Sequence, residues 1–531
     1  MNAEAFCMYL TQKGIKEGFK EKGYVVAAYD RDVIKENTLN NPEWIHFGAG
    51  NIFRAFQGNL MDRLLENGAA KTGLLVCEGF DYEIVEKMYR PHDNLSILVT
   101  LKADGTMEKK VIQSIVDSFI LDRDNDSEFK KIRAVFEKPS LKMVSFTITE
   151  KGYVVKDATG ELLPSTKTDI ELGPDKAKSY IGKVVSLLYY RYKAGELPVA
   201  MVSMDNCSHN GDKLHDAVVT FAKGWVANGL ADSDFVKYIE DPAKVSFPWS
   251  MIDKITPRPD AKVEEMLEKD GIEDLETVVT GKNTYVAPFV NAEETEYLVI
   301  EDCFPNGKVE LDKVGVIYTD RETVDKVEKM KVCTCLNPLH TSLAIFGCLL
   351  GYTTIHDEME DEDLKNLVYT LGHKEGMKTV VDPGVLRPED FLEAVLKKRL
   401  PNPFMPDTPQ RIACDTSQKL PIRFGETVKA YRRREDLSTD SLTLIPLVFA
   451  GWLKYLEGVD DTGKKFELSP DPMLDTLCKL KPEEILDRQE IFGCDLSEDG
   501  LKDKVLKIYS EMSEPGAVRE VLHKYVCEAM A

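Results

Sequence analysis

The stretch from Trp44 to Gly58, WIHFGAGNIFRAFQG, constrains the fold of this chain more than any other. A short apolar run ends at Gly48-Ala49-Gly50, and apolar residues at helical spacing follow at once. A buried strand, a turn with two glycines and then a helix can hold a pyrophosphate, because glycines let the backbone approach the phosphates and the helix N-terminus offers free N–H groups. Phe53 replaces the third glycine of the usual G-x-G-x-x-G pattern. The residues expected to bind a dinucleotide are Phe47, Gly48, Ala49, Gly50, Asn51, Ile52 and Arg54.

An acidic residue is expected close to this turn. A second short strand is predicted at Leu74–Cys77, and Glu78 follows it. In dinucleotide folds, an acidic residue at the end of the second strand accepts hydrogen bonds from the adenosine ribose and repels a 2′-phosphate. Glu78 lies farther past Gly50 than the usual spacing of about 20 residues, so Asp81 is an alternative. Either residue would favour NAD over NADP, and a plain surface carboxylate is the competing interpretation.

Composition limits the possible partners and the compartment. A chain of 531 residues predicts two domains or three. Its net charge of −23 argues against a nucleic-acid or anionic-membrane partner. The 11 cysteines do not suggest a disulfide framework, and the N-terminus lacks the order of a signal peptide. The longest apolar stretch, Leu442 to Leu456, is too short to span a membrane. We therefore expect a cytoplasmic protein.

The order of the predicted elements indicates the fold class. Strand-like runs at Leu141–Thr149 and Pro198–Met204 alternate with a helix over Lys176–Lys193, which argues for a parallel sheet with its ligand at the carboxyl ends of the strands. Asn206 lies at such an end. Beyond about residue 320, helical periodicity dominates at Val324–Tyr352, Asp361–Gly372, Pro388–Lys398, Leu442–Leu456 and Leu501–Met530.

These patterns predict an α/β protein with a Rossmann-type N-terminal domain and a mostly α-helical C-terminal domain. The expected boundaries are a helical N-terminal extension at 1–40, an NAD-binding domain at 41–320 and a helical substrate domain at 321–531. The active site is expected in the cleft between the two domains.

The segment Lys331–His340, KVCTCLNPLH, concentrates polar side chains ahead of an apolar helix. Asn337 is a good helix cap followed by proline, and His340 lies one turn further on. Both residues could take part in catalysis. Alternatively, Asn337 only caps the helix and His340 is an ordinary core histidine. Cys333, Cys335 and His340 match no common zinc spacing, so we expect no metal.

A basic set follows in the segment 402–423, which contains Arg411, Lys419 and Arg423 among turn-forming residues. Fixed cationic donors of this kind suit a polyhydroxylated or carboxylated substrate. A solvated charged surface is the alternative interpretation.

Several segments, taken in order, resemble one family. HFGAGNIFRAFQG, TITEKGY (147–153), SMDNCSHNG (203–211), SMIDKITP (250–257), NPLH and the DTPQR…DTSQK pair are similar to motifs of the polyol-specific long-chain dehydrogenases, the mannitol dehydrogenase family. The resemblance implies metal-independent hydride transfer with NAD, acting on a small sugar alcohol or sugar acid. It further implies Lys331 as the acid/base, Asn206 and Asn337 as donors to the reacting oxygen, and His340 as an orienting residue. The implied substrate-binding residues are Asp253, Arg411 and Lys419.

One departure concerns the position of the lysine. In the family pattern four residues separate the lysine from the asparagine, whereas five separate Lys331 from Asn337. Either the turn carries a one-residue insertion or the lysine is displaced, and Lys329 fits the pattern less well.

The basic set favours a hexonate pair such as fructuronate and mannonate over a neutral ketose. The alternatives within the family are a mannitol 2-dehydrogenase acting on fructose and mannitol, and a tagaturonate reductase. Two further alternatives are a non-catalytic NAD-binding regulatory protein and a zinc-dependent alcohol dehydrogenase. The sequence leaves the oligomeric state open.

Overall fold

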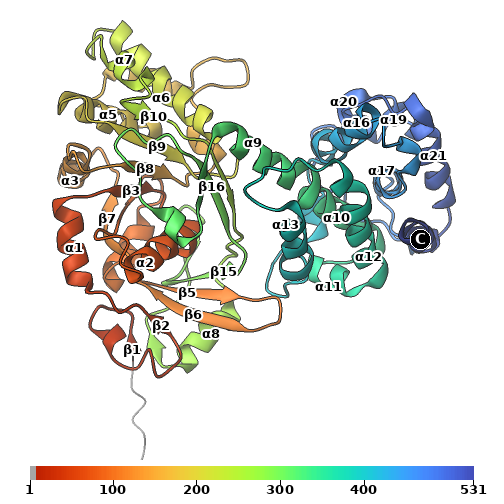
Figure 1. The fold of residues 1–531 in the computed structure, drawn as a ribbon, viewed down its shortest axis with the longest axis horizontal. Coiled ribbons are helices and arrows are strands. Elements are labelled where there is room, and N and C mark those ends of the chain that lie inside the picture. The colour runs from red at the N-terminus through yellow and green to blue at the C-terminus, as the bar shows by residue number, and fades with distance from the viewer. Residues whose placement is uncertain (1–7) are drawn as a thin grey trace, which may run out of the picture. The chain divides into compact units, whose positions relative to one another are not determined.

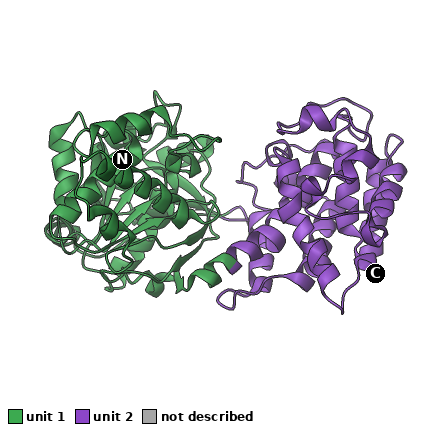
Figure 2. Cartoon of the chain, turned by 90° about the horizontal axis from the view of Figure 1, so that it is seen from above, with its two compact units in different colours: residues 1–101, 106–325 green, residues 102–105, 326–531 purple. Residues whose placement is uncertain are grey.

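The structure is a computed structural model that describes residues 8–531. The chain forms two compact units (Figure 2). Unit 1 comprises the chain up to Leu101 together with Thr106–Asp325, and unit 2 comprises Lys102–Gly105 together with Lys326–Ala531. The main passage from one unit to the other therefore follows Asp325.

Unit 1 is built on a six-stranded sheet in which every neighbouring pair is parallel. The strand order is β10-β9-β8-β3-β4-β7 (Figure 1). Numbered along the chain within this sheet, that order is the Rossmann order, whose ligand crevice lies where the strand order reverses, here between β3 and β8. The predicted Rossmann-type fold is confirmed. The strands are β3 (Trp44–Phe47), β4 (Leu74–Glu78), β7 (Ile115–Ile120), β8 (Met143–Phe146), β9 (Val199–Ser203) and β10 (Val245–Ser246).

Apolar runs explain why this sheet is buried. All residues of β3, β4, β8 and β9 are buried, as expected for parallel strands covered on both faces. The helices α3 (Asp126–Phe136), α5 (Tyr180–Lys193) and α6 (Asn210–Ala227) pack in a row, and α6 also packs on β9. Helix α2 (Gly58–Glu66) continues the helix that follows the glycine turn.

Smaller sheets extend unit 1. A four-stranded sheet has the order β15-β5-β6-β2, a three-stranded sheet the order β11-β16-β17, and β13 and β14 form a hairpin. Their bounds are β2 (Val25–Val26), β5 (Ser96–Leu101), β6 (Met107–Ile112), β11 (Ser250–Asp253), β13 (Val278–Val279), β14 (Tyr285–Val286), β15 (Phe289–Glu293), β16 (Tyr297–Glu301) and β17 (Ile317–Thr319).

The N-terminal segment differs from the helical extension expected at 1–40. Its residues 1–7 lie outside the described residues. Helix α1 (Arg31–Asn40) is present, but β1 (Met8–Tyr9) pairs with β12 (Ile272–Glu273), and β2 pairs with β6. These strands depend on partners far along the chain, which no local pattern indicates.

A long helix leads into unit 2. It runs from Arg321 to Leu350 as α9 (Arg321–Met330), a π-helical turn at Lys331–Cys335 and α10 (Asn337–Leu350). By length and composition this helix could cross a membrane, but most of its apolar part is buried inside the protein, as in a core helix.

Unit 2 is helical, and no strand is assigned within its described residues. Its core forms where α10 packs against α17 (Leu444–Tyr455), the buried helix expected at Leu442–Leu456. The N-terminus of α17 is satisfied by the buried Glu375, whose carboxylate accepts hydrogen bonds from three successive backbone N–H groups. Other helices are α11 (Ile355–Glu360), α12 (Glu362–Thr370), α13 (Pro388–Ala394), α14 (Pro409–Ile412), α15 (Thr416–Leu420), α16 (Glu426–Arg433), α18 (Leu474–Leu477), α19 (Pro482–Leu486), α20 (Gln489–Phe492), α21 (Leu501–Glu511) and α22 (Ala517–Met530).

Glu358 of α11 makes the stability of this unit depend on pH. Its carboxyl group is fully buried beside Gly347, and neither oxygen accepts a hydrogen bond from the described part of the chain. Burial raises its pKa well above the ordinary value of 4.5. The folded chain then keeps a proton that the unfolded chain releases, so the free energy of unfolding falls as pH rises above about 4.5 toward the folded pKa.

We expect Glu358→Gln to remove this fall, which amounts to at most about 1.4 kcal/mol per pH unit. Urea unfolding at about pH 5 and about pH 7 measures it. The exposed Glu362 supplies the control, because its charge is not among those that raise the Glu358 pKa, and Glu362→Gln should leave the pH dependence of the wild-type chain unchanged. Equal pH dependence in Glu358→Gln and the wild type would contradict the prediction.

Candidate active site

The glycine turn follows β3 at the crevice of the sheet. Gly48 has φ +109°, and a Cβ there would lie 2.2 Å from the carbonyl oxygen of Thr147, which follows β8. A Cβ on Gly50 would meet no atom within 4 Å, and the helix begins at the next residue. The first glycine thus lets the ends of two strands meet, and the second leaves open space at a helix N-terminus.

A cleft of about 590 Å³ lies beside this turn, and all its lining residues belong to unit 1. Gly48, Gly50, Glu78 and Asp81 line it, together with the loop that follows β8. Sequence reasoning gave this loop, TITEKGY, no part in cofactor binding, although its recurrence as a motif was a signal. The cleft therefore lies where a Rossmann-type fold binds its ligand.

Glu78 and Asp81, the two candidates for binding the adenosine ribose, differ in the hydrogen-bond partners of their carboxylates. Oε2 of Glu78 accepts a hydrogen bond from the N–H of Ala49 at 2.8 Å, and Oε1 accepts from the N–H groups of Phe80 and Asp81. Burial raises the pKa of Glu78 although these three donors favour its charged form. Glu78 therefore holds the glycine turn to the end of β4. Oδ2 of Asp81 accepts a hydrogen bond from the hydroxyl of Thr280 at 2.5 Å.

Arg54 is turned away from the cleft. Its buried guanidinium donates to Ser96 Oγ at 3.0 Å, to the carbonyl oxygen of Ala287 at 2.7 Å and to Asn51 Oδ1 at 2.9 Å. Its place is structural, because these bonds tie the helix after the turn to β5 and to the chain just before β15. The same helix holds Phe53 in a π-helical turn.

The remaining turn residues support the turn from within. Phe53 stacks on His46 of β3 with ring centroids 4.4 Å apart, which accounts for an aromatic residue where the pattern has a third glycine. Phe47 and Ala49 are completely buried, and Asn51 and Ile52 are half-buried in the first residues of the helix. None of these side chains lines the cleft.

Asn206 is an exposed side chain on a turn that is fixed on both sides. Asp205 accepts hydrogen bonds from the N–H groups of Ile148 and Thr149 and from the hydroxyl of Tyr153. These bonds join the end of β9 to the loop after β8. Sequence reasoning missed Asp205, whose signal was its place beside Asn206 after a buried strand.

Asn210 fixes the other side of the same turn. Its amide nitrogen donates to the carbonyl oxygens of Ser203, Asp205 and Ser250 at 3.0–3.2 Å. Ser250 begins β11, and the expected substrate residue Asp253, which is buried, ends that strand. The structure thus links the turn of Asn206 to the strand of Asp253.

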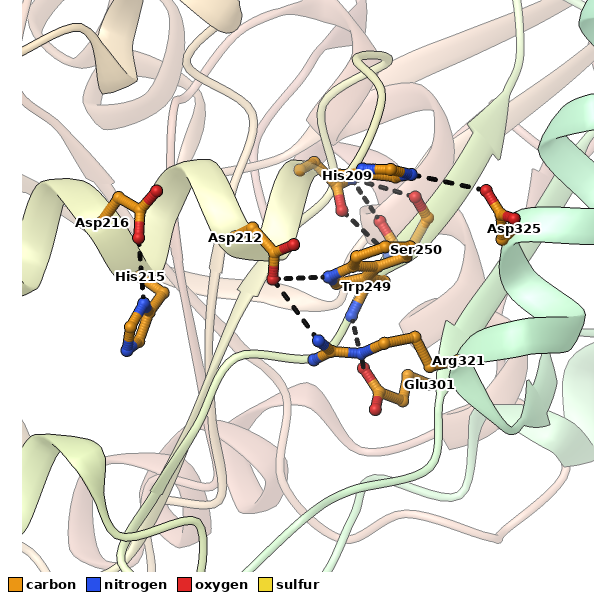
Figure 3. A network of polar contacts seen from close by, with 10 residues as sticks. His209, Asp212, His215, Asp216, Trp249, Ser250, Glu301, Arg321 and Asp325 are labelled. Carbon is orange, nitrogen blue, oxygen red and sulfur yellow. Dashed lines mark hydrogen bonds and ion pairs between the residues drawn. The ribbon is translucent and has the colours of Figure 1, made fainter.

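The first turn of α9 packs against the segment that follows Asn206 (Figure 3). The rings of His209 and Trp249 stack with centroids 4.1 Å apart, and the guanidinium of Arg321 lies 4.7 Å from the Trp249 ring. The indole N–H of Trp249 donates to Asp212 at 2.8 Å, and His209 Nε2 lies 3.4 Å from Asp325. The helix that continues to Lys331 therefore begins at a defined place on unit 1.

Lys331 begins the π-helical turn of that helix and is buried. The N–H of Leu336 donates to the carbonyl oxygen of Lys331, five residues back, at 3.1 Å. A π-helical turn accommodates one residue more than an α-helical turn. This turn has room for one extra residue between Lys331 and Asn337, which favours the one-residue insertion over a displaced lysine.

His340 lies on the first turns of α10, where its Nε2 is 3.7 Å from Oδ2 of Asp407. Asp407 is buried and also pairs with the exposed guanidinium of Arg411. The Asp407 carboxylate therefore lies between an imidazole and a guanidinium. Asp407 is a further residue to which the sequence analysis gave no role, although it begins the DTPQR motif.

Lys419 and Arg423, unlike Arg411, donate to uncharged oxygens. The Lys419 ammonium donates to the carbonyl oxygens of Ile412 and Cys414, and burial lowers its pKa. NH1 of Arg423 donates to the hydroxyl of Thr341 at 2.5 Å. Burial lowers the pKa of Arg423 to about 10.

Burial also affects the two cysteines of this segment. Burial raises the pKa of Cys333 to about 11 and that of Cys335 to about 12. Zinc binds the thiolate form, which such burial disfavours. Their chemistry gives no support to a zinc site.

Comparison with known proteins identifies the family. The Rossmann-domain model of mannitol dehydrogenase matches residues 42–313, and the C-terminal-domain model of mannitol dehydrogenase matches residues 323–513. The chain therefore belongs to the mannitol dehydrogenase family. The expected family and the expected class, an oxidoreductase, are confirmed.

Particular relatives agree with this assignment. The chain is 49% identical to D-mannonate oxidoreductase of Thermotoga maritima, over 98% of this chain and 99% of the relative. Its fold is similar to that of a substrate-free D-sorbitol dehydrogenase, with TM-score 0.78 and 27% identity over 94% of this chain and 97% of that one. It is also similar to Pseudomonas fluorescens mannitol 2-dehydrogenase in a ternary complex with NAD and D-mannitol, with TM-score 0.70 and 25% identity over 98% and 100% of the two chains.

Proposed function

We propose that this protein is an NAD(H)-dependent, metal-independent oxidoreductase that interconverts D-mannonate and D-fructuronate. The observation that carries the proposal is the 49% identity, along almost the whole of both chains, to a relative named D-mannonate oxidoreductase. The reaction removes a hydride and a proton from a secondary alcohol of the hexonate and leaves a ketone. In the reverse direction the ketone gains both.

The residues of the cleft fit a dinucleotide. Gly48 has a positive φ that glycine readily adopts, and Gly50 leaves open space beside a helix N-terminus. Together they form a place for a pyrophosphate. Asp81, shortly after the end of β4, offers a carboxylate to the adenosine ribose. When bound, the nicotinamide ring accepts or supplies the hydride.

The chain's own residues then handle the proton and the developing charge. Lys331 gives its proton to the ketone oxygen in reduction and takes it back in oxidation. The amides of Asn206 and Asn337 donate hydrogen bonds to that oxygen, an effect of about 10²–10³ in rate per donor. His340, which lies beside Asp407, orients the substrate. Asp253, Arg411 and Lys419 bind the remaining hydroxyl groups of the substrate.

Arg423 supports an acidic substrate. Arg411 is already paired with Asp407, and the Lys419 ammonium is bonded to backbone carbonyls. Arg423 makes one hydrogen bond, to Thr341 beside His340, and pairs with no carboxylate in the described part of the chain. A guanidinium has five N–H donors, so the others remain for a ligand carboxylate.

We expect Arg423→Gln to raise KM for fructuronate by about tenfold or more, since glutamine keeps a donor for Thr341 but loses the charge. KM for a neutral ketose such as fructose should change much less. Initial rates of NADH oxidation with both substrates measure the difference. Arg432→Gln, at an arginine paired with Glu498 and Asp499, is the matched control and should change neither KM. Equal losses for both substrates in Arg423→Gln would mean that Arg423 does not recognise the carboxylate.

A screen of NADH oxidation against fructuronate, tagaturonate, fructose and fructose 6-phosphate tests the proposed function. The highest kcat/KM should be found with fructuronate. A preference for fructose or tagaturonate would replace it with the mannitol 2-dehydrogenase or tagaturonate reductase alternative. NADH binding without turnover on any substrate would favour a regulatory protein.

A cytoplasmic location fits the proposal, since the described cysteines are free thiols.

A further inference from the structure

The hairpin of β13 and β14 reaches the cleft from a distant part of the sequence. Its tip, residues 280–284, follows the Rossmann core strands and was assigned no function from the sequence. Thr284 of this tip lines the same cleft as Glu78 and Asp81. The hairpin therefore borders the end of the cleft that carries the candidate ribose carboxylates.

The hydroxyl group of Thr280 is oriented by the hairpin itself. Thr280 is buried, and its Oγ1 accepts hydrogen bonds from the backbone N–H groups of Lys282 and Thr284, both at 3.2 Å. A hydroxyl has two lone pairs and one proton. With both lone pairs used, its proton points to Asp81, whose Oδ2 accepts it at 2.5 Å.

Two further contacts hold the hairpin tip at this place. The N–H of Gly281 donates to Oε1 of Glu83 at 2.9 Å. The ammonium of Lys282 lies 5.2 Å from the centroid of the exposed Phe80 ring. The segment from Phe80 to Glu83 thus packs against the tip at three separate points.

The partners of the two carboxylates decide which one can take a ligand. Within the described residues, all three hydrogen bonds of the Glu78 carboxylate come from backbone N–H groups that shape the turn. Oδ1 of Asp81, by contrast, accepts no hydrogen bond from the residues that the structure describes. Asp81 lines the cleft, so this oxygen can accept a hydrogen bond from a ligand hydroxyl.

We infer that Thr280 is a positioning residue that holds Asp81 for the adenosine ribose and thereby sets the preference for NADH over NADPH. The inference rests on the proposed dinucleotide function of the cleft. A carboxylate held in this place accepts ribose hydroxyls and repels a 2′-phosphate. Without the Thr280 proton, the Asp81 side chain loses the donor that fixes its orientation.

The test measures binding of NADH and NADPH to the full chain by nucleotide fluorescence, which requires no substrate. Thr280→Val should weaken NADH binding by about tenfold, the effect of one hydrogen bond to a charged group. NADPH binding should stay the same or tighten, so the preference for NADH falls by at least the same factor. Thr280→Ser, which restores the hydroxyl, should restore both values.

Thr277 provides a matched control on the same hairpin. Its hydroxyl donates to Oε2 of Glu264 at 2.6 Å, a bond of the same kind with a residue outside the cleft lining. Thr277→Val should therefore leave the NADH preference unchanged. An equal loss in Thr277→Val, or wild-type binding and preference in Thr280→Val, would overturn the inference.

The outcomes separate this inference from the proposed function. Selective loss of NADH binding in Thr280→Val, without turnover of any hexuronate by the wild type, would support the role of Thr280 and contradict the proposed reaction. If the wild type turns over fructuronate and Thr280→Val keeps the wild-type cofactor preference, the proposed reaction is supported and the role of Thr280 is contradicted. A wild-type chain that binds neither nucleotide would overturn both.

Discussion

Replacing Lys331 with alanine should lower kcat for ketone reduction by about 10³-fold, the usual contribution of a general acid. Binding of NADH should stay intact, because the cleft with the glycine turn belongs to unit 1 and Lys331 belongs to unit 2. Steady-state rates and NADH fluorescence, measured on the same preparation, separate the two effects. A variant with near-normal kcat would rule out Lys331 as the proton donor.

Lys329 provides the control for position. It lies on the same helix two residues earlier and is the alternative lysine in sequence. If the π-helical turn absorbs the extra residue, Lys329→Ala should retain most of the wild-type kcat. A loss in Lys329→Ala as large as that in Lys331→Ala would show that the two lysines cannot be distinguished by position. A loss in Lys329→Ala alone would favour the displaced lysine.

Replacing Gly48 with alanine should destabilise the fold and abolish NADH binding. The new Cβ would lie 2.2 Å from a backbone oxygen, at a residue with φ +109°, so the ends of β3 and β8 must separate. We expect a loss of about 3 kcal/mol in the free energy of unfolding, the scale of backbone strain combined with a core clash. Urea unfolding and NADH fluorescence measure both losses.

Gly50 is the contrasting position in the same turn. A Cβ there meets no protein atom within 4 Å, so Gly50→Ala should change the free energy of unfolding by less than about 0.5 kcal/mol. The same methyl group would occupy space that the backbone leaves for a pyrophosphate, and NADH binding should weaken by about tenfold or more. If Gly50→Ala binds NADH normally, the pyrophosphate does not approach this residue.

Much of the fold could be predicted because the signals are local. Trp44–Phe47 is a strand with the predicted bounds, and the helix expected at Leu442–Leu456 spans Leu444–Tyr455. Pro446 does not break that helix, because it lies in the first turn, where backbone N–H groups have no partner within the helix. The two-residue strands of the N-terminal segment escaped prediction because their partners lie far along the chain.

The position of Lys331 shows what a spacing pattern leaves open. Counting residues left both an insertion and a displaced lysine open. The hydrogen bond from Leu336 to Lys331 reveals a π-helical turn, which favours the insertion. None of the residue types in KVCTC distinguishes a π-helical turn from an α-helical one, so the sequence could not predict this turn.

The sequence by itself determined the class of fold, the glycine turn and the family, because strands, turns and motifs depend on residues close together in the chain. Only the tertiary structure showed that Arg54 points inward, that Glu78 is used by backbone N–H groups, and that Thr280 donates to Asp81. The partner of a side chain is decided by which distant segments fold beside it. The glycine turn therefore indicates where we expect a dinucleotide to bind, and the hydrogen bonds around it distinguish Glu78, which shapes the turn, from Asp81, which has a carboxylate oxygen left for a ligand in the cleft.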